Sequence, residues 1–295
     1  MDVSIIIVNY NTTALLQACV ESIIQLTTGV SYEIIVVDNA SREEEVAPLR
    51  HDDRFILIEA SGNLGFGRAN NLGLTRTKGK YIFFLNSDTI LLNNAVKMFC
   101  DFAEAHGSSI AAIGGILENR KGELVHSYGH FPHIANTLWN ILLLIPIKKA
   151  MHLYKEPMPV WPDEYREVEY ITGADLFVPK SILDQCGAFD PAFFMYYEET
   201  EMQHRFLLAG YKNILLRGPR IIHLEGESAK KNGASKFLRD TLRQERSLFI
   251  YFRLTEPRWK YIMFRILYPT FRQTLWINPK VSFADKCKVM KNLIK

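Results

Sequence analysis

The chain has 295 residues, of which 48% are hydrophobic and 23% are charged, and its formal net charge is +3. This composition is typical of a globular protein and excludes a disordered, collagen-like or low-complexity chain. The four cysteines lie far apart without a C-x-x-C pair, which argues against a disulfide framework or a structural zinc site and favours a reducing, cytosolic setting.

The N-terminus begins with an apolar run that no basic residue precedes and no small-residue cleavage site follows, so we expect no signal peptide. The longest apolar stretch, residues 138–147, contains Asn140 and Pro146 and falls short of the ~20 residues that a membrane-spanning helix needs. We therefore predict that the chain does not cross a membrane.

Short apolar runs alternate with helical-looking segments in the first half of the chain. The runs lie at residues 4–8, 34–37, 55–58, 81–85 and 110–113. Unbroken apolar runs are typical of strands buried on both faces, and the spacing leaves room for crossover helices. The pattern predicts an α/β fold with a mostly parallel central sheet and helices on both sides. The first helix is indicated by Leu16, Cys19, Val20 and Ile23, with Asn11 as its N-cap.

Polar residues follow three of these runs. The clusters are Asn9, Tyr10 and Asn11 after the first run, Asp38, Asn39 and Ser41 after the second, and Asn86, Ser87 and Asp88 after the fourth. Because the carboxyl ends of parallel strands share one edge of a sheet, the clusters are expected to converge at a ligand site. The alternative is that each cluster only caps a helix or begins a turn.

A glycine-rich segment, residues 62–73, follows the third run and opens a helix. Its glycines let backbone N–H groups approach an anion, and the helix N-terminus adds a partial positive charge. The segment is not a G-x-G-x-x-G after the first strand, so a dinucleotide-binding fingerprint is not supported. A tight turn with close helix packing at Gly73 is the alternative, but a turn does not require Arg68.

An acidic segment follows an aromatic run at residues 193–197. If a helix begins at Glu198, then Glu198, Glu201 and Arg205 share one face while Glu199 projects from another. The aromatic surroundings would raise the pKa of a carboxyl toward the range that a general base needs. The alternative is an ordinary helix N-terminus that its dipole enriches in acids.

The histidines give weaker signals. His223 follows two isoleucines, which is the pattern of a buried core histidine. His126, His130 and His133 show no ligand spacing on a convincing helix, so a separate zinc site is not expected.

Four motifs, in this order, resemble the nucleotide-sugar half of family 2 glycosyltransferases, which have the GT-A fold. They lie at residues 4–11 (SIIIVNYN), 36–41 (VVDNAS), 63–71 (NLGFGRANN) and 84–89 (FLNSDT). The Asn-Leu-Gly-Phe form of the third motif resembles bacterial rhamnosyltransferase-like members. The resemblance covers roughly residues 3–255 and implies a catalytic domain over 1–235, with a donor half to about residue 109 and an acceptor half over 110–235.

The resemblance assigns roles to individual residues. Asp38 resembles the carboxylate that holds the nucleotide base, and Arg68 the side chain beside the base or diphosphate. Asp88 corresponds to the last acid of the D-x-D metal motif, whose first acid is replaced here by Asn86. Mg2+ or Mn2+ is therefore expected on Asp88, with His223 nearby and with diphosphate oxygens and waters completing its coordination. The expected donor-binding residues are Asn9, Tyr10, Asn11, Asp38, Asn63, Arg68 and Ser87.

The expected general base is Glu199, at the position of the Asp in the Glu-Asp pair of the family, and Glu198 is the fallback. Glu201 replaces a later Asp of the same motif. The implied reaction is inverting, non-processive transfer of a sugar from a dTDP- or UDP-linked donor to a hydroxyl of a glycan or lipid-linked acceptor in cell-surface polysaccharide synthesis.

Three other functions are alternatives to this one. A sugar nucleotidyltransferase would need a Gly-rich, Arg- and Lys-containing loop after the first strand, where residues 9–12 stand instead. A non-catalytic carbohydrate- or membrane-binding module is the second alternative. A processive synthase is disfavoured because no Gln-x-x-Arg-Trp follows Glu199.

The C-terminal segment, residues 236–295, holds 14 basic, 4 acidic and 11 aromatic residues. We expect a helical tail that holds a cytoplasmic enzyme peripherally on the anionic inner face of the plasma membrane. Aromatic side chains such as Trp259, Phe264 and Tyr268 would settle at the headgroup level. The alternative is that these aromatics pack on the catalytic domain. Nucleic acid is not an expected partner, because no recognisable binding module is present.

Overall fold

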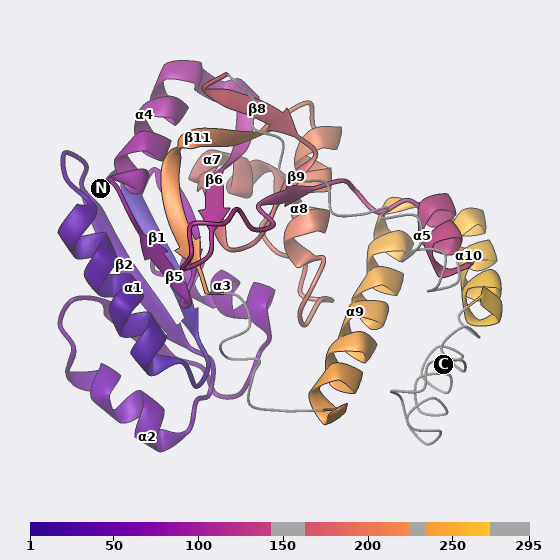
Figure 1. The fold of residues 1–295 in the computed structure, drawn as a ribbon, viewed down its shortest axis with the longest axis horizontal. Coiled ribbons are helices and arrows are strands. Elements are labelled where there is room, and N and C mark those ends of the chain that lie inside the picture. Colours follow the sequence, from indigo (N-terminus) through magenta and orange to yellow (C-terminus); the bar gives the residue numbers. More distant parts are fainter. Residues whose placement is uncertain (143–162, 225–233, 272–295) are drawn as a thin grey trace. The chain divides into compact units, whose positions relative to one another are not determined.

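The computed structural model describes residues 1–142, 163–224 and 234–271 (Figure 1). Its backbone contacts divide the chain into two compact units. The sheet unit comprises Met1–His130 and Val160–Ser228, and the helical unit comprises Phe131–Pro159 and Ala229–Lys295. Residues 131–159, which the sequence placed in the acceptor half of the catalytic domain, thus group with the C-terminal segment.

Nine strands form the main sheet of the described residues, in the order β3-β2-β1-β4-β10-β6-β11-β5, with β8 also paired to β11. The strands are β1 (Val3–Asn9), β2 (Tyr32–Asp38), β3 (Ile56–Glu59), β4 (Tyr81–Asn86), β5 (Thr89–Leu91), β6 (Ile110–Glu118), β8 (Tyr165–Val168), β10 (Asp175–Pro179) and β11 (Lys212–His223). A small second sheet pairs β7 (Tyr128–Gly129) with β9 (Tyr170–Ile171).

The direction of the strands agrees with the predicted, mostly parallel sheet. Strands β3, β2, β1 and β4 are parallel neighbours, and β6 is parallel to β11. Strand β10 is antiparallel to both β4 and β6, which therefore run the same way, and β5 and β8 are antiparallel to β11. The five apolar runs of the sequence correspond to β1, β2, β3, β4 and β6.

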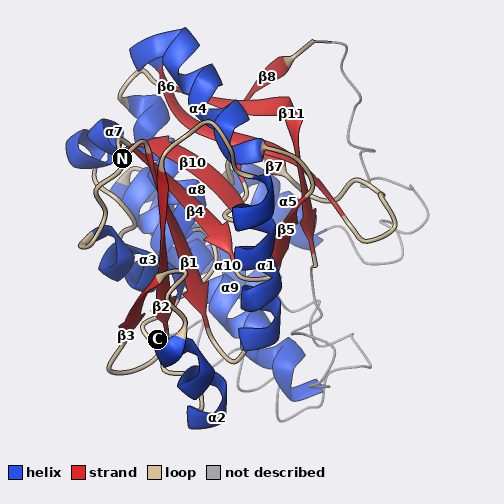
Figure 2. Ribbon diagram, turned by 90° about the vertical axis from the view of Figure 1, so that its left-hand side faces the viewer, coloured by secondary structure: helices blue, strands red, loops and turns tan. Residues whose placement is uncertain are grey.

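Helices cover both faces of this sheet (Figure 2). They are α1 (Thr13–Leu26), α2 (Glu43–Val46), η1 (Ala47–His51), α3 (Phe66–Leu74), α4 (Ala95–His106), η2 (Gly107–Ser109), α7 (Lys180–Cys186) and α8 (Glu198–Leu208). Ile5 and Ile7 of β1 share a buried cluster with the apolar faces of α1 and α4. Ile6, which points to the opposite face, lies beneath α3, where a Cβ on Gly73 would come within 2.6 Å of its Cγ2 atom. Both faces of β1 are therefore buried, as its unbroken apolar run predicts.

The start of α1 differs from the prediction by one residue. Thr12, and not Asn11, occupies the N-cap position. Asn11 has a left-handed backbone with φ of 56°, a conformation that asparagine tolerates better than most residues, and its side chain accepts a hydrogen bond from the Arg42 backbone N–H. Asn11 therefore shapes the loop after β1 and does not cap the helix.

The helical unit contains α5 (Ile134–Leu142), α9 (Ala234–Thr255) and α10 (Arg258–Phe271). Phe264 and Tyr268 of α10 are buried, and the Phe264 ring lies 4.7 Å from that of Phe252 on α9, centroid to centroid. These two aromatics pack inside the helical unit, so the expectation that they anchor a membrane is wrong. Among the described helices, none combines the length and the apolar character needed to span a bilayer. Residues 272–295 of the basic tail, which include the aromatic residue Trp276, lie outside the described residues.

Candidate active site

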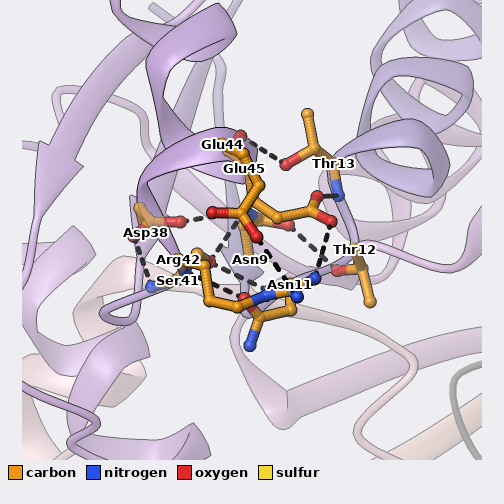
Figure 3. A network of polar contacts seen from close by, with 9 residues as sticks. All are labelled: Asn9, Asn11, Thr12, Thr13, Asp38, Ser41, Arg42, Glu44 and Glu45. Carbon is orange, nitrogen blue, oxygen red and sulfur yellow. Dashed lines mark hydrogen bonds and ion pairs between the residues drawn. The ribbon is translucent and has the colours of Figure 1, made fainter.

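The carboxyl ends of β1 and β2 meet in a polar network (Figure 3). Asn9 lies opposite Asp38 in the register of the two strands, and its Nδ2 donates to Asp38 Oδ1 over 2.9 Å. The other oxygen, Asp38 Oδ2, accepts from the backbone N–H of Ser41 over 2.9 Å. A carboxylate offers about four acceptor positions, so these two hydrogen bonds do not use the full acceptor capacity of Asp38, which is 2% exposed. The predicted convergence of the first two polar clusters is confirmed.

The network extends to the end of β4. Thr12 Oγ1 donates to Asn9 Oδ1 over 2.9 Å and lies 3.0 Å from Ser87 Oγ. The backbone N–H of Asn11 donates to Ser41 Oγ, while the side chain of Tyr10 is exposed. All three polar clusters therefore lie along one sheet edge, although Thr12, which links them, was not among the predicted site residues.

The loop before α3 is fastened by Asn39, a residue to which the sequence assigned no separate role. Asn39 is buried, and its Oδ1 accepts from the backbone N–H of Leu64 over 2.7 Å. Its Nδ2 donates to Asn63 Oδ1 and to the carbonyl of Gly65. The side chain of Asn63 thus holds the loop, and its Oδ1 also accepts from the Gly65 N–H. Arg68 follows in the first turn of α3, exposed and without an ion-pair partner among the described residues.

Asp88 and His223 face each other at the end of β4 and β11. His223 Nε2 lies 3.4 Å from Asp88 Oδ1 and 3.4 Å from Asn86 Nδ2. The side chain of His223 is only 12% exposed, and that of Asp88 is 17% exposed. The pairing of β5 with β11 holds this arrangement, because His223 lies opposite Thr89 and the Leu224 N–H donates to the Asp88 carbonyl. His223 is therefore paired with a carboxylate and does not lie among apolar side chains alone.

A carboxylate oxygen next to an imidazole nitrogen is a donor set that suits a divalent ion such as Mn2+ or Mg2+. Within the described ranges, no three His, Cys, Asp or Glu side chains gather as a complete metal site. The pair formed by Asp88 and His223 therefore fits an ion that takes its remaining ligands from water and from the substrate.

The acids of the predicted base motif begin helix α8, as expected. Glu198 is 2% exposed, and its Oε2 has no hydrogen-bond partner among the described residues. It lies against α3, where a Cβ on Gly67 would be 3.5 Å from the Glu198 Cβ. Burial, and after it the neighbouring charge of Glu199, raise the pKa of Glu198 well above its usual range.

Glu199 is only partly buried and points elsewhere. Its side chain lies beside Gly173, where a built Cβ would be 3.6 Å from the Glu199 Cγ. Burial raises the pKa of Glu199, and hydrogen bonds from its own N–H and from Thr200 oppose that rise. Burial raises the pKa of the Tyr170 and Tyr197 phenols, and the nearby charge of Glu199 raises both pKa values further. The predicted rise in carboxyl pKa is present in both glutamates.

Glu201 and Arg205 share a face of α8, as the helical spacing predicts. Arg205 Nε donates to Glu201 Oε1 over 2.9 Å. Its guanidinium also donates to the backbone carbonyls of residues 186, 187 and 188, which lie ahead of the aromatic run. Arg205 therefore fixes the segment that leads into the base motif, a role that depends on long-range contacts and that no sequence spacing signals.

The residues just before α8 have an unusual backbone. Tyr196 and Tyr197 have φ of 74° and 66°, in the left-handed region that bulky residues seldom adopt. Upstream, the Phe194 carbonyl accepts from the Phe66 N–H at the start of α3 over 2.9 Å. Such strain is retained where surrounding contacts determine the conformation, and it is common at functional sites.

Backbone contacts join the Asp88–His223 pair to the predicted base motif. The N–H of Asn86 donates to the Ala174 carbonyl over 3.0 Å. Ala174 directly follows Gly173, against which Glu199 packs. The turn that carries Asp88 and the helix that carries Glu199 therefore approach one another through a single short segment, residues 173–174.

Comparison with known proteins agrees with this geometry. The family model described as glycosyl transferase family 2 matches residues 4–158, which is more than half of the chain. The chain belongs to glycosyl transferase family 2. The resemblance inferred from the sequence is thereby confirmed, and membership in this family supports a role in glycosyl transfer and argues against the nucleotidyltransferase alternative.

Two relatives with named activities illustrate what this family 2 chain is similar to. The low-salt glycan biosynthesis hexosyltransferase Agl10 of Haloferax volcanii is 28% identical over 208 residues, or 69% of this chain and 61% of that protein. The N-acetylglucosaminyl-diphospho-decaprenol L-rhamnosyltransferase of Mycobacterium tuberculosis is 21% identical over 236 residues, or 72% of this chain and 73% of that protein. The alignment with the first relative thus spans less than two thirds of its length.

Solved structures show the same fold at low sequence identity. The crystal structure of GalNAc-T7 with UDP, GalNAc and Mn2+ matches with a TM-score of 0.62 and 15% sequence identity. The match covers 99% of this chain and 54% of the GalNAc-T7 chain. The crystal structure of S. aureus TarS matches with a TM-score of 0.56 and 13% sequence identity. The match covers 97% of this chain and 47% of the TarS chain. The family 2 chain therefore has the GT-A fold.

Proposed function

We propose that this chain is an inverting, non-processive glycosyltransferase that moves a hexosyl or deoxyhexosyl group from a nucleotide-diphosphate sugar to an acceptor hydroxyl. The observation that carries the proposal is the position of Glu199, a partly buried carboxyl of raised pKa, beside the short segment 173–174 that holds the Asp88 turn. The proposed base for the acceptor and the turn whose Asp88 would hold a charge-neutralising cation for the diphosphate are thus linked through one short segment.

The donor would lie along the edge formed by β1, β2 and β4. The acceptor capacity left on Asp38 suits the single N–H group, at N3, of a uracil or thymine base, and Asn9, Asn11 and Ser87 hold the surrounding loops. Arg68, exposed at the start of α3, supplies positive charge toward the diphosphate together with the helix N-terminus. We therefore expect a UDP- or dTDP-linked donor.

The chain supplies two ligands for Mg2+ or Mn2+, Asp88 and His223, which fit such an ion by donor type and proximity. When bound, the ion would neutralise negative charge on the departing diphosphate. That stabilisation removes the need for a general acid on the leaving group. Asn86 Nδ2 lies 3.4 Å from the same Nε2 atom of His223, so an ion bound there would take the place of this contact.

Glu199 would take the proton from the acceptor hydroxyl as its oxygen attacks the anomeric carbon and the bond to the diphosphate breaks. Attack from the face opposite the leaving group inverts the anomeric configuration, and the oxocarbenium-like character of the transition state is shared with glycoside hydrolysis. The raised pKa of Glu199 makes its carboxylate a stronger base than an ordinary glutamate. Glu198, which is more deeply buried, would hold a proton and leave Glu199 as the ionised member of the pair.

The names of the relatives suggest the acceptor class. One acts on N-acetylglucosaminyl-diphospho-decaprenol and the other in glycan biosynthesis, so we propose a glycan or lipid-linked acceptor in cell-surface polysaccharide synthesis. A lipid-linked acceptor places the reaction at a membrane surface, on its cytoplasmic side. This is the surface that the basic, aromatic tail of the sequence is predicted to bind.

The experiment is a panel of nucleotide sugars tested for metal-dependent donor hydrolysis and for thermal stabilisation with Mn2+. At least one UDP- or dTDP-sugar should be turned over and should raise the melting temperature, and Asp88→Ala should lose both effects while keeping its fold. Arg76→Ala, which replaces an exposed residue outside the site, is the control. Full activity of Asp88→Ala with unchanged metal dependence would refute the ion-binding role.

A further inference from the structure

Helix α10 has two apolar faces. Phe264 and Tyr268 lie in the buried core of the helical unit, whereas four other large apolar side chains are exposed. The exposed stripe consists of Trp259, Ile262, Met263 and Ile266, with exposed fractions of 62%, 47%, 50% and 66%. Their spacing of three, four and seven residues puts them on one side of the helix. The core of the unit therefore accounts for one apolar face and leaves the exposed stripe unexplained.

Basic residues border the exposed stripe on both sides. At about 100° per residue, Arg258 and Arg265 fall along one border and Lys260 along the other. All three are exposed, and α10 contains no acidic residue. Lys260 Nζ lies 5.8 Å from the centroid of the Trp259 ring and 3.4 Å from Glu256 Oε2, just before the helix. An apolar stripe with an exposed tryptophan between rows of basic side chains is the pattern of a helix that lies in a membrane interface.

We propose that the exposed stripe of α10 inserts into the headgroup region of an anionic bilayer, with the helix lying parallel to the surface. Trp259 would settle at the headgroup level, Ile262, Met263 and Ile266 would reach the acyl boundary, and the flanking basic groups would contact lipid phosphates. This assignment replaces the buried Phe264 and Tyr268 by exposed side chains as the anchoring residues. It concerns the helical unit alone and does not depend on the proposed function.

A second copy of the chain is a poorer occupant of this stripe. In a two-fold symmetric dimer, the same surface of both protomers would meet, so the basic borders of one helix would face those of the other. Because α10 offers no acidic side chain to pair with them, such a contact would bring like charges together. A surface of negative charge complements the stripe and its borders at once.

The test is flotation of the full-length protein with vesicles of phosphatidylcholine, with and without phosphatidylglycerol, in the absence of any sugar donor. The intact protein should float with the anionic vesicles at low salt and dissociate at high salt. Trp259→Ser combined with Met263→Ser should weaken the vesicle binding constant about tenfold or more, because two large apolar groups no longer enter the interface. Arg258→Gln combined with Arg265→Gln should weaken binding to anionic vesicles by a similar factor and remove most of the salt dependence.

The control is Leu208→Ser on α8 of the sheet unit, where a large apolar side chain is 74% exposed. It should bind vesicles as the intact protein does. All variants replace exposed side chains, and unchanged circular dichroism and melting temperature would show that they remain folded.

The proposal is overturned if the intact protein does not bind anionic vesicles at low salt, or if the Trp259 and Met263 variant binds as tightly as the intact protein. It is also overturned if sedimentation without lipid shows a dimer that this variant dissociates while vesicle binding persists, since the stripe would then be a contact between copies. Because no donor is present, failure here leaves the glycosyltransferase proposal untouched, and inactivity toward nucleotide sugars leaves this one untouched.

Discussion

Replacing Glu199 with glutamine should nearly abolish sugar transfer without weakening donor binding. The amide keeps the size of the side chain and its contact with Gly173, but it cannot accept the proton of the acceptor hydroxyl. Loss of a general base typically slows turnover by roughly 10²- to 10⁴-fold. At about 1.4 kcal/mol per factor of ten, this corresponds to roughly 3 to 5 kcal/mol of lost transition-state stabilisation.

The neighbouring substitution, Glu198→Gln, should behave differently. Because Glu198 is almost fully buried and its pKa is raised well above the usual range, we expect it to be protonated when Glu199 is ionised. Glutamine then imitates the native, neutral form, and turnover should fall by less than about tenfold. Both variants need to be compared in the same assay, since sequence alone left the choice between the two acids open.

The assay is steady-state transfer together with donor affinity measured by calorimetry, for both variants and the native chain. Glu199→Gln should lose kcat with little change in donor affinity, and the acid limb of the native pH–rate profile should lie above the usual pKa of a glutamate. If Glu198→Gln loses more activity than Glu199→Gln, then Glu198 is the base. If neither variant loses more than about tenfold, general-base catalysis by this pair is refuted.

Other substitutions probe the surroundings of the site. The stability of Glu198→Gln should rise relative to that of the native chain as pH rises. A carboxyl whose pKa is raised in the folded state stabilises the fold below its unfolded pKa of about 4.3, and this contribution is lost as pH rises through the folded-state pKa. Melting temperatures of the two proteins that change in parallel from pH 4 to 9 would contradict this prediction. Asn39→Ala should lower the free energy of unfolding, measured by chemical denaturation, by about 1 to 3 kcal/mol, because the Leu64 N–H loses its acceptor. The same change should weaken donor binding. Unchanged donor affinity would show that this loop does not contribute to the donor site. Gly73→Ala should lower the free energy of unfolding by about 1 to 3 kcal/mol, because its Cβ would press on Ile6 and Val37. Gly62→Ala is the control and should be nearly neutral, because a Cβ there meets nothing within 4 Å. Equal effects of the two substitutions would refute the close packing of α3.

Much of the sheet could be predicted because its signals are local. The apolar runs identified β1, β2, β3, β4 and β6 since strands buried on both faces have no polar positions. The reversed strands β5 and β10 gave no such signal, because β5 is three residues long and β10 lies far along the chain from the strands that it joins. The burial of Phe264 and Tyr268 was also not predictable, since composition does not tell which aromatics of a tail face its own core.

The candidate site shows the same division. Asn9, Asp38 and Ser87 could be placed together because parallel strands bring their carboxyl ends to one edge. The approach of His223 to Asp88 depends on the antiparallel pairing of β5 with β11, which joins residues more than 130 positions apart. The hold of Arg205 on three backbone carbonyls depends likewise on tertiary contacts. Motif spacing identified the residues that we propose to carry the chemistry, and it missed the residues that position them.

The first turn of α3 connects the donor edge to the base motif, which explains why two glycines stand there. From the end of β2, Asn39 fixes the backbone at Leu64 and Gly65, and the next residue, Phe66, donates its N–H to the Phe194 carbonyl ahead of α8. Gly65 has φ of 84°, and a Cβ there would strike that carbonyl, while a Cβ on Gly67 would meet Phe189 at 3.0 Å and approach Glu198. Any side chain at these two positions would push α8 and its acids away from the sheet edge. The glycine-rich segment is therefore explained by the packing of the proposed base motif on α3 at least as directly as by the approach of a phosphate.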